Sequence, residues 1–351
     1  MTTPQTLSAA DIRERVTATT PWREASTGGE AIAAALKVAR SASQDIVDRL
    51  DGASRIVITG AGSSLYISQV AAFSMRARAN LPAEAQPLSE VLLQPDAVFA
   101  GQSLADQPVI VVSRSGSTTE ALEVIKAAQA RGQYTIAVTC RPHAPMAGLA
   151  DATLAVPEGD EEAIVMTRSF ASQTALLMRL GARLGDEAFA ADLDAMPDQW
   201  PGLAPWIEQA FELAATNPSR LIVLGGGAAF GLANEAVLKA TEMSQVPASA
   251  FHPLEFRHGP MSVCEPGVIV VGILGGSSEE TERRVIEETA VLGATTLLFG
   301  PDGPGADLDE IARLPLVLHV LQALALGIAV GRGLDPESPR HLDQVVVIDD
   351  Q

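Results

Sequence analysis

Two stretches of the chain repeat one pattern. Residues 55–75 read RIVITGAGSSLYISQVAAFSM, and residues 220–240 read RLIVLGGGAAFGLANEAVLKA. Each stretch has a basic residue, a short apolar run, a turn with the pattern Gly-x-Gly and then an alanine-rich segment. A short apolar run that leads through a glycine turn into a helix is typical of a buried strand in a parallel sheet. The pair therefore predicts two copies of a strand-turn-helix unit.

A second pair of stretches extends the repeat. Residues 109–132 read VIVVSRSGSTTEALEVIKAAQARG, and residues 268–293 read VIVVGILGGSSEETERRVIEETAVLG. In both, an apolar strand meets a Gly/Ser turn and an amphipathic helix, and the next strand is TIAVT at 135–139 or TTLLF at 295–299. The two pairs are displaced by nearly the same distance, so one β-α-β-α-β unit occurs twice. We expect an α/β fold with two parallel sheets flanked by helices.

The repeat divides the chain into three parts. We expect an N-terminal helical segment at residues 1–45, with helices at 9–16 and 29–48, a first domain at 46–195 and a second domain at 196–351. Residues 192–218 contain four prolines and are the expected connection. The longest apolar run, 314–330, contains His319 and Gln322 and is short for a bilayer crossing, so it predicts a buried helix.

The composition excludes several classes of protein. Hydrophobic residues make up 47% and aromatic residues only 4%, so Ala, Val, Leu and Ile must build the core. A net charge of −19 argues against nucleic acid or an anionic membrane as a partner. It allows a small phosphate ligand, which backbone N–H groups and hydroxyls can hold. Cys140 and Cys264 are expected to be small buried hydrophobes, and the absence of an apolar leader predicts a cytoplasmic protein.

The turn at residues 113–118, Ser-Arg-Ser-Gly-Ser-Thr, is dense in hydroxyl groups. It follows a predicted strand and opens a helix near Thr118, where unpartnered N–H groups attract anions. Ligands of parallel sheets bind at such strand ends. The sequence therefore predicts a phosphate site at this turn. The alternative is an ordinary helix cap, with Glu120 completing a capping box.

The second copy has lost most of these hydroxyls. Gly62, Ser63 and Ser64 in the first copy correspond to Gly-Ala-Ala at 227–229, and the turn at 274–278 is richer in glycine. This asymmetry predicts one phosphate site, in the first half. The Gly-x-Gly turns alone are weak evidence for a dinucleotide, and no acidic residue ends the next strand, so we expect no NAD.

A predicted helix at residues 234–243 carries three charges in an apolar context. Glu235, Lys239 and Glu242 are spaced four and three apart, so they share one helix face. A surface ladder of ion pairs is the alternative explanation. We favour a partly buried acid–base group, with Glu242 as the proton shuttle, because this helix should cover the second sheet.

The next segment, residues 250–260, is bounded by Pro and Gly and contains His252 and His258. No Cys or carboxylate spacing supports a metal site there. An acid–base role for one histidine is the better interpretation.

With these motifs, the chain from about residue 30 to its end resembles the sugar isomerase (SIS) superfamily. It is most similar to the isomerase half of glucosamine-6-phosphate synthase and to the SIS-type glucosamine-6-phosphate deaminases. The resemblance implies two tandem SIS domains and no metal or cofactor. It also implies a homodimer with shared active sites, since His258 reaches the neighbouring subunit's site and assists ring opening. Its remaining implied site residues are Gly62, Ser63, Ser64, Ser113, the Arg114 backbone, Ser115 and Thr118 around the phosphate, Thr167 along the sugar, Lys239 near the reacting carbons and Glu242 as the base.

The chain departs from the synthase in two ways. It has no glutaminase domain with an N-terminal cysteine, and Gln344 stands where the synthase has a lysine after the motif Pro-Arg-x-Leu. We therefore expect a hydrolase of amino sugar metabolism that converts glucosamine 6-phosphate to fructose 6-phosphate and ammonia. The alternatives are an aldose–ketose isomerase, a galactosamine-6-phosphate deaminase and a fructosamine-phosphate deglycase. A sugar-phosphate-sensing regulator is disfavoured because no DNA-binding segment is visible and Lys239, Glu242 and His258 are all present.

Overall fold

The computed structural model describes residues 7–99 and 104–344. They form two compact units that alternate along the chain. The front unit, as we call it, comprises Gly28–Glu161, Arg168–Pro197 and the tail from Asp343, and the rear unit comprises the chain up to Thr27, Glu162–Thr167 and Asp198–Leu342. The segment predicted at 1–45 thus contributes to both units. Its first six residues, and the last seven of the segment predicted at 196–351, lie outside the described residues.

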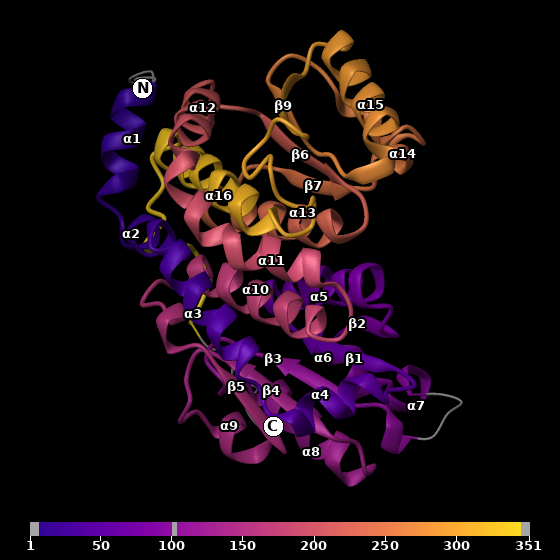
Figure 1. The fold of residues 1–351 in the computed structure, drawn as a ribbon. Helices are drawn as coiled ribbons and strands as arrows, with labels where there is room; N and C mark the ends of the chain where they lie inside the picture. Colours follow the sequence, from indigo (N-terminus) through magenta and orange to yellow (C-terminus); the bar gives the residue numbers. More distant parts are fainter. Residues whose placement is uncertain (1–6, 100–103, 345–351) are drawn as a thin grey trace. The chain divides into compact units, whose positions relative to one another are not determined.

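The front unit contains a five-stranded parallel sheet in the order β2-β1-β3-β4-β5 (Figure 1). Strands β1, β3 and β4 are buried along their whole length, which is why they are continuous runs of Val, Ile, Ala and Thr. The predicted strands near 55, 109 and 135 are confirmed. The strands are β1 (Ile56–Gly60), β2 (Ala83–Pro87), β3 (Val109–Val112), β4 (Thr135–Thr139) and β5 (Ala152–Ala155).

Helices surround this sheet. The helix predicted at 29–48 is two helices, α3 and α4, because Ser43 caps a new helix by accepting a hydrogen bond from the amide of Ile46. Among the others, α10 packs on α3 and α5. The helices are α3 (Gly28–Arg40), α4 (Gln44–Asp51), α5 (Ser63–Ala79), α6 (Leu88–Leu93), α7 (Pro95–Val98), α8 (Thr119–Ala130), α9 (Pro145–Leu149), α10 (Arg168–Ala182) and α11 (Glu187–Ala195).

The rear unit contains a four-stranded parallel sheet in the order β7-β6-β8-β9. Residues 192–218, predicted as a connection, are largely helical, because α11, a 3₁₀ segment (Met196–Leu203) and α12 occupy most of them. The strands are β6 (Arg220–Gly225), β7 (Ala248–Phe251), β8 (Val268–Ile273) and β9 (Thr295–Phe299). The helices are α1 (Ala9–Thr17), α2 (Thr20–Ser26), α12 (Ala204–Ala215), α13 (Ala228–Lys239), α14 (Pro253–Phe256), α15 (Glu279–Val291) and α16 (Leu314–Gly331).

The backbone repeats the sequence pattern closely. Gly62 precedes α5 with φ 55° and ψ −128°, and Gly227 precedes α13 with φ 58° and ψ −126°. A Cβ on Gly60 would lie 2.4 Å from the backbone of Ser64, and a Cβ on Gly225 would lie 2.6 Å from the backbone of Ala229. Both turns therefore need glycine for the same close approach of helix to strand. The predicted doubling of the strand-turn-helix unit is confirmed.

The apolar run at 314–330 forms α16, which packs on α12 and α13. By length and composition alone α16 could cross a membrane, but 94% of it is buried within the protein. The prediction of a buried core helix is confirmed. Its two polar residues, His319 and Gln322, are each 2% exposed.

Candidate active site

The phosphate-binding candidates lie at one edge of the front sheet. Strands β1 and β3 are parallel neighbours, so the turns that follow them, 60–64 and 113–118, leave the sheet at the same edge. The strand order changes direction between these two strands, since β2 lies beyond β1 and β4 lies beyond β3. Parallel sheets bind ligands in the crevice outside such a point.

The turn after β3 is ordered by its own hydroxyl groups. The Oγ of Ser113 accepts a hydrogen bond from the amide of Gly116 at 3.2 Å and lies 3.3 Å from the Oγ1 of Thr118. The Oγ of Ser115 accepts from the amide of Ser117 at 3.3 Å. Gly116 has φ 64°, and a Cβ there would lie 2.6 Å from the Cβ of Ala144. These contacts fold the turn into a tight loop in front of α8.

The ordinary helix-cap explanation for this turn does not hold. Thr118 occupies the N-cap position of α8, yet its side chain makes no capping hydrogen bond. The Oγ1 of Thr118 instead faces Ser113. Gly62, at the N-cap of α5, has no side chain with which to cap that helix. Two helix starts at the same sheet edge thus lack a side-chain cap, as an anion site requires.

Arg114 takes part through its side chain as well as its backbone. The guanidinium is 5% exposed, and it donates to the carboxylate of Glu161 at 3.4 Å and to the carbonyl of Gln344 at 3.3 Å. Glu161 also accepts from the amide and the hydroxyl of Ser169, at 3.2 and 2.6 Å. The side-chain amide of Gln344 donates to the carbonyl of Glu161 at 3.1 Å. Gln344 therefore has a structural role beside the phosphate turn. Neither Glu161 nor Ser169 was predicted as a site residue.

A pocket of about 500 Å³ opens beside the same turn. Ser115 and Ser117 line it together with residues 140–145, Pro157 and Asp160. Arg141 pairs with Asp160 at 2.9 Å on its wall, which leaves little net charge there. Cys140 is buried as predicted, and burial raises the pKa of its thiol, so it is a poor nucleophile.

The acid–base candidates lie in the rear unit, where α13 changes into one turn of π-helix at Ala240–Ser244. The Nζ of Lys239 lies 2.5 Å from Glu242 and 3.6 Å from Glu235. Lys239 and Glu235 are almost fully buried, whereas 18% of the Glu242 side chain is exposed. The alternative of a solvated surface ladder is therefore wrong. A π-turn that carries a partly exposed carboxylate beside a buried ammonium is typical of a functional site.

The segment Glu162–Thr167 is held at both ends within the rear unit. The carboxylate of Glu24 on α2 accepts from the amides of Glu162 and Ala163, at 2.6 and 3.1 Å. At the other end, the side-chain amide of Gln322 on α16 donates to the carbonyl of Thr167 at 3.2 Å. Thr167 itself is fully buried. Glu24 and Gln322 were not predicted as site residues, because each lies far from Thr167 in sequence.

His258 lies in the rear unit, in the segment that follows β7. It is exposed, follows the short helix α14 and precedes Gly259, which has φ 121°. Its backbone amide donates to the carbonyl of Glu255 at 3.0 Å. His252, the other histidine of this segment, stacks on Phe230 with 4.0 Å between ring centroids. Within the described ranges, no group of three or more His, Cys, Asp or Glu side chains could hold a metal ion.

The rear unit fills its corresponding turn with one of its own side chains. The carboxylate of Glu282 on α15 accepts from the amide of Gly275 at 3.1 Å and from the hydroxyl of Ser278 at 3.0 Å. It also lies 2.9 Å from where a Cβ of Gly226 would stand. A carboxylate thus occupies the edge that corresponds to the hydroxyl-rich turns of the front unit. These contacts favour the prediction that the second copy binds no phosphate, which stays a prediction.

Comparison with known proteins agrees with this geometry. Residues 49–183 match the family model of the SIS domain. Its relatives include the glutamine–fructose-6-phosphate aminotransferases (isomerizing) of Aeropyrum pernix, 29% identical over 85% of this chain, and of Leifsonia xyli, 27% identical over 85%. In each case the matched part is 52% of the relative, so this chain spans about half the length of those enzymes.

Solved structures share the fold over nearly the whole chain. The glucosamine-6-phosphate deaminase of Thermotoga maritima has a TM-score of 0.78 at 26% identity, and the match covers 94% of this chain and all of that one. The tagatose-6-phosphate ketose/aldose isomerase of Escherichia coli also has a TM-score of 0.78, at 21% identity, with 95% and 97% covered. The second likeness concerns the fold alone.

Proposed function

We propose that the protein is a cytoplasmic enzyme that deaminates glucosamine 6-phosphate to fructose 6-phosphate and ammonia. The observation that carries this proposal is the hydroxyl-lined turn at 113–118, with a helix start that no side chain caps. The deaminase of Thermotoga maritima, which matches along its full length, supports this reaction.

The proposal includes two SIS copies per chain. The second copy is the rear unit, whose strand order and glycine turn repeat those of the front unit. In this scheme, Ser64, Ser113, Ser115, Thr118 and the backbone of Arg114 hold the 6-phosphate, Gly62 and Ser63 border it, and Thr167 lines the sugar. Lys239 lies near the reacting carbons, and Glu242 is the base. His258 serves the site of a second subunit, so the enzyme is a homodimer.

The chemistry needs one proton shuttle and one water. His258 assists opening of the sugar ring, which gives an aldehyde at C1 and an amine at C2. Glu242 removes the proton from C2 and returns it to C1, while a second proton passes from the amine nitrogen to O1. The C2 imine that results takes up water and releases ammonia. The ammonium of Lys239, 2.5 Å from Glu242, stabilises the negative charge that Glu242 needs to accept a proton.

Product analysis tests the reaction. Purified protein is incubated separately with glucosamine 6-phosphate, galactosamine 6-phosphate and fructosamine 6-phosphate, and ammonia and keto-sugar phosphate are measured together. Equal amounts of both products from the gluco sugar support the proposal. Ketose without ammonia would indicate an isomerase. Preference for galactosamine 6-phosphate would indicate a galactosamine-6-phosphate deaminase, and preference for fructosamine 6-phosphate would indicate a deglycase. Binding without any turnover would favour a sensor.

Two variants separate the two halves of the site. Glu242→Gln should lower kcat at least about a thousandfold while sugar-phosphate binding persists, because only the proton shuttle is lost. Ser115→Ala should instead raise KM several-fold. Glu280→Gln on α15, which removes an exposed carboxylate paired with Arg284, is the matched control and should leave both constants unchanged. Retained turnover in Glu242→Gln would assign the base to another residue.

A further inference from the structure

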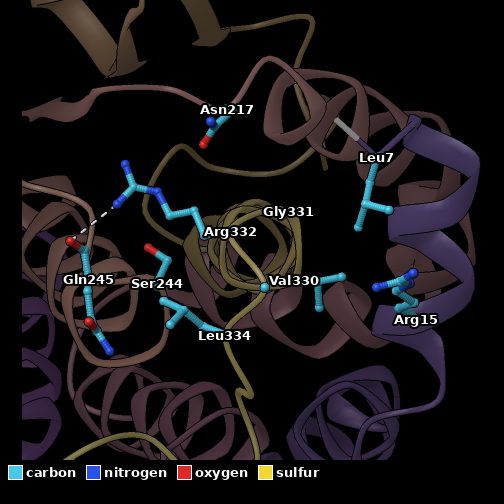
Figure 2. A pocket seen from close by; sticks show the side chains of 10 residues that line it. Leu7, Arg15, Asn217, Ser244, Gln245, Val330, Gly331, Arg332 and Leu334 are labelled. Atoms are coloured by element: carbon cyan, nitrogen blue, oxygen red, sulfur yellow. Dashed lines mark hydrogen bonds between the residues drawn. The ribbon is translucent and has the colours of Figure 1, made fainter. Parts of the chain in front are cut away.

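A second pocket lies in the rear unit, at the C-terminal end of α16 (Figure 2). Its volume is about 700 Å³, within the range of small-molecule sites. The last turn of α16 and the residues after it form its floor, while α1 and the segment that ends α13 form its sides. The lining residues are Leu7, Arg15, Asn217, Ser244, Gln245, Val330, Gly331, Arg332, Gly333 and Leu334.

The charge of this pocket is opposite to that of the chain. Its ten lining residues include two arginines and no carboxylate, although Asp and Glu outnumber Lys and Arg by 43 to 24 in the sequence. Figure 2 shows Arg15 and Arg332 on opposite sides of the end of α16. Asp11, one turn before Arg15 on α1, accepts from the amide and hydroxyl of Ser8. The charge of Asp11 also interacts with that of Arg15, but Asp11 is not among the ten residues that line the pocket.

Two carbonyl groups at the end of α16 already accept hydrogen bonds. The carbonyls of Ala329 and Val330 accept from the amides of Leu334 and Gly333, both at 2.9 Å, which closes the end of α16. The guanidinium of Arg332 donates to the carbonyl of Gln245 at 3.4 Å and to that of Pro218 at 2.8 Å. A helix C-terminus would otherwise repel an anion. Here that repulsion is reduced because N–H groups of the protein cover the carbonyls.

Donor groups remain available to a ligand. Arg15 is exposed and lines the pocket, and the only carboxylate recorded as interacting with its charge among the described residues is Asp11, on its own helix. The guanidinium of Arg340 donates a hydrogen bond to the side-chain oxygen of Gln245. The NH₂ group of Gln245 therefore points away from Arg340. Leu7, Val330 and Leu334 add apolar surface. An arginine beside apolar side chains suits a carboxylate or phosphate attached to an organic body.

From these contacts we propose that this pocket binds a small organic anion, with the acidic group at Arg15 and the body against Leu7, Val330 and Leu334. Arg332 contributes positive charge from the opposite wall and holds that wall together through its two carbonyl contacts. The site is separate from the phosphate turn and does not depend on the proposed reaction.

Methyl NMR of the intact protein tests this site locally. With ¹³C-labelled Leu and Val methyl groups, the signals of Val330 and Leu334 are followed during titration with citrate, adenosine 5′-monophosphate or inorganic phosphate up to about 5 mM. At least one organic anion should shift both signals to saturation. A shift by citrate alone identifies a carboxylate ligand, and a shift by the nucleotide alone identifies a phosphate ester.

Two variants on α1 make the test specific. Arg15→Gln should weaken binding about tenfold or more, because it removes the charge-assisted contact. Arg13→Gln is the matched control: Arg13 is exposed on the same helix and pairs with Glu208, outside the pocket lining, so the affinity should stay within about twofold. The proposal is overturned if no probe shifts the signals, if sodium chloride of equal ionic strength shifts them equally, or if Arg15→Gln binds as tightly as the parent.

Discussion

Replacing Lys239 by methionine should destabilise the protein and stop its chemistry, and the two effects can be separated. Lys239 lies between Glu235, which is fully buried, and Glu242. Without the ammonium, two carboxylates face one another and one of them has no contact with solvent. Removing one partner of a buried ion pair costs about 3–5 kcal/mol. At a urea m-value of about 2–3 kcal/mol/M, the midpoint of unfolding should fall by about 1–2 M.

The chain offers a matched control for this change. Lys126 and Glu123 on α8 have the same spacing of three residues and lie 2.7 Å apart, but about half of each side chain is exposed. Lys126→Met should therefore cost less than about 1 kcal/mol. Urea unfolding followed by circular dichroism measures the loss of unfolding free energy in each variant. If the loss in Lys239→Met is no larger than in Lys126→Met, the ion pair of Lys239 is not desolvated and the reasoning is refuted.

A double variant separates stability from catalysis. Glu235→Gln combined with Lys239→Met removes the buried charge together with its partner, so most of the lost stability should return. Glu242 would remain without its ammonium, and ammonia release from glucosamine 6-phosphate should stay low. Recovery of activity together with stability would show that Lys239 serves the fold alone.

Three further predictions concern other parts of the chain. Burial between Trp22 and Trp200 lowers the pKa of His319 to about 4, so between pH 6.5 and 4 the unfolded chain binds a proton at His319 and the folded chain does not. The free energy of unfolding should therefore fall by up to about 1.4 kcal/mol per pH unit over that range. This contribution to the pH dependence should be absent when urea unfolding is measured on His319→Gln. Gly116→Ala should raise KM at least about tenfold by forcing apart the phosphate turn, whereas Gly132→Ala, which also has positive φ but an open surrounding, should leave steady-state KM unchanged. Glu24→Gln should lower kcat/KM several-fold and the free energy of unfolding by about 1–2 kcal/mol. The carboxylate of Glu24 accepts hydrogen bonds from the backbone amides of Glu162 and Ala163, and the NH₂ group of glutamine cannot accept one of them. Steady-state rates and urea midpoints, measured on the same preparation, check this.

The features that sequence predicted best are local. Strands β1, β3 and β6 are uninterrupted apolar runs that end in glycine turns, so periodicity and turn chemistry agree at those places. The edge strands β2 and β7 were not predicted, because they are only partly buried and their residues, such as Glu84 and Ser249, lack the apolar signal. Helix α4 was merged with α3 because the cap at Ser43 lies within an otherwise helical pattern.

The site residues that escaped prediction depend on distant contacts. Glu161 is recognisable only through Arg114 and Ser169, and Gln322 only through Thr167, which lies 155 residues earlier. Single buried polar residues have no periodic signature in a sequence. The asymmetry between the copies could be predicted from the lost hydroxyls, but the carboxylate of Glu282 that fills the rear turn could not, because nothing in its helix distinguishes it from the neighbouring glutamates.

Both units build the same turn and use it in opposite ways, which agrees with the proposal of a phosphate ligand for a chain of net charge −19. A helix start after a parallel strand attracts an anion in either unit, because the attraction comes from backbone N–H groups and not from surface lysines. In the rear unit the carboxylate of Glu282 satisfies it from within. In the front unit the hydroxyls of Ser113 and Thr118 face one another, and no carboxylate of the described residues hydrogen-bonds to either of them. The net charge of −19 therefore disfavours large polyanionic partners, whereas the proposed small anion depends on two hydroxyl-lined turns at one sheet edge.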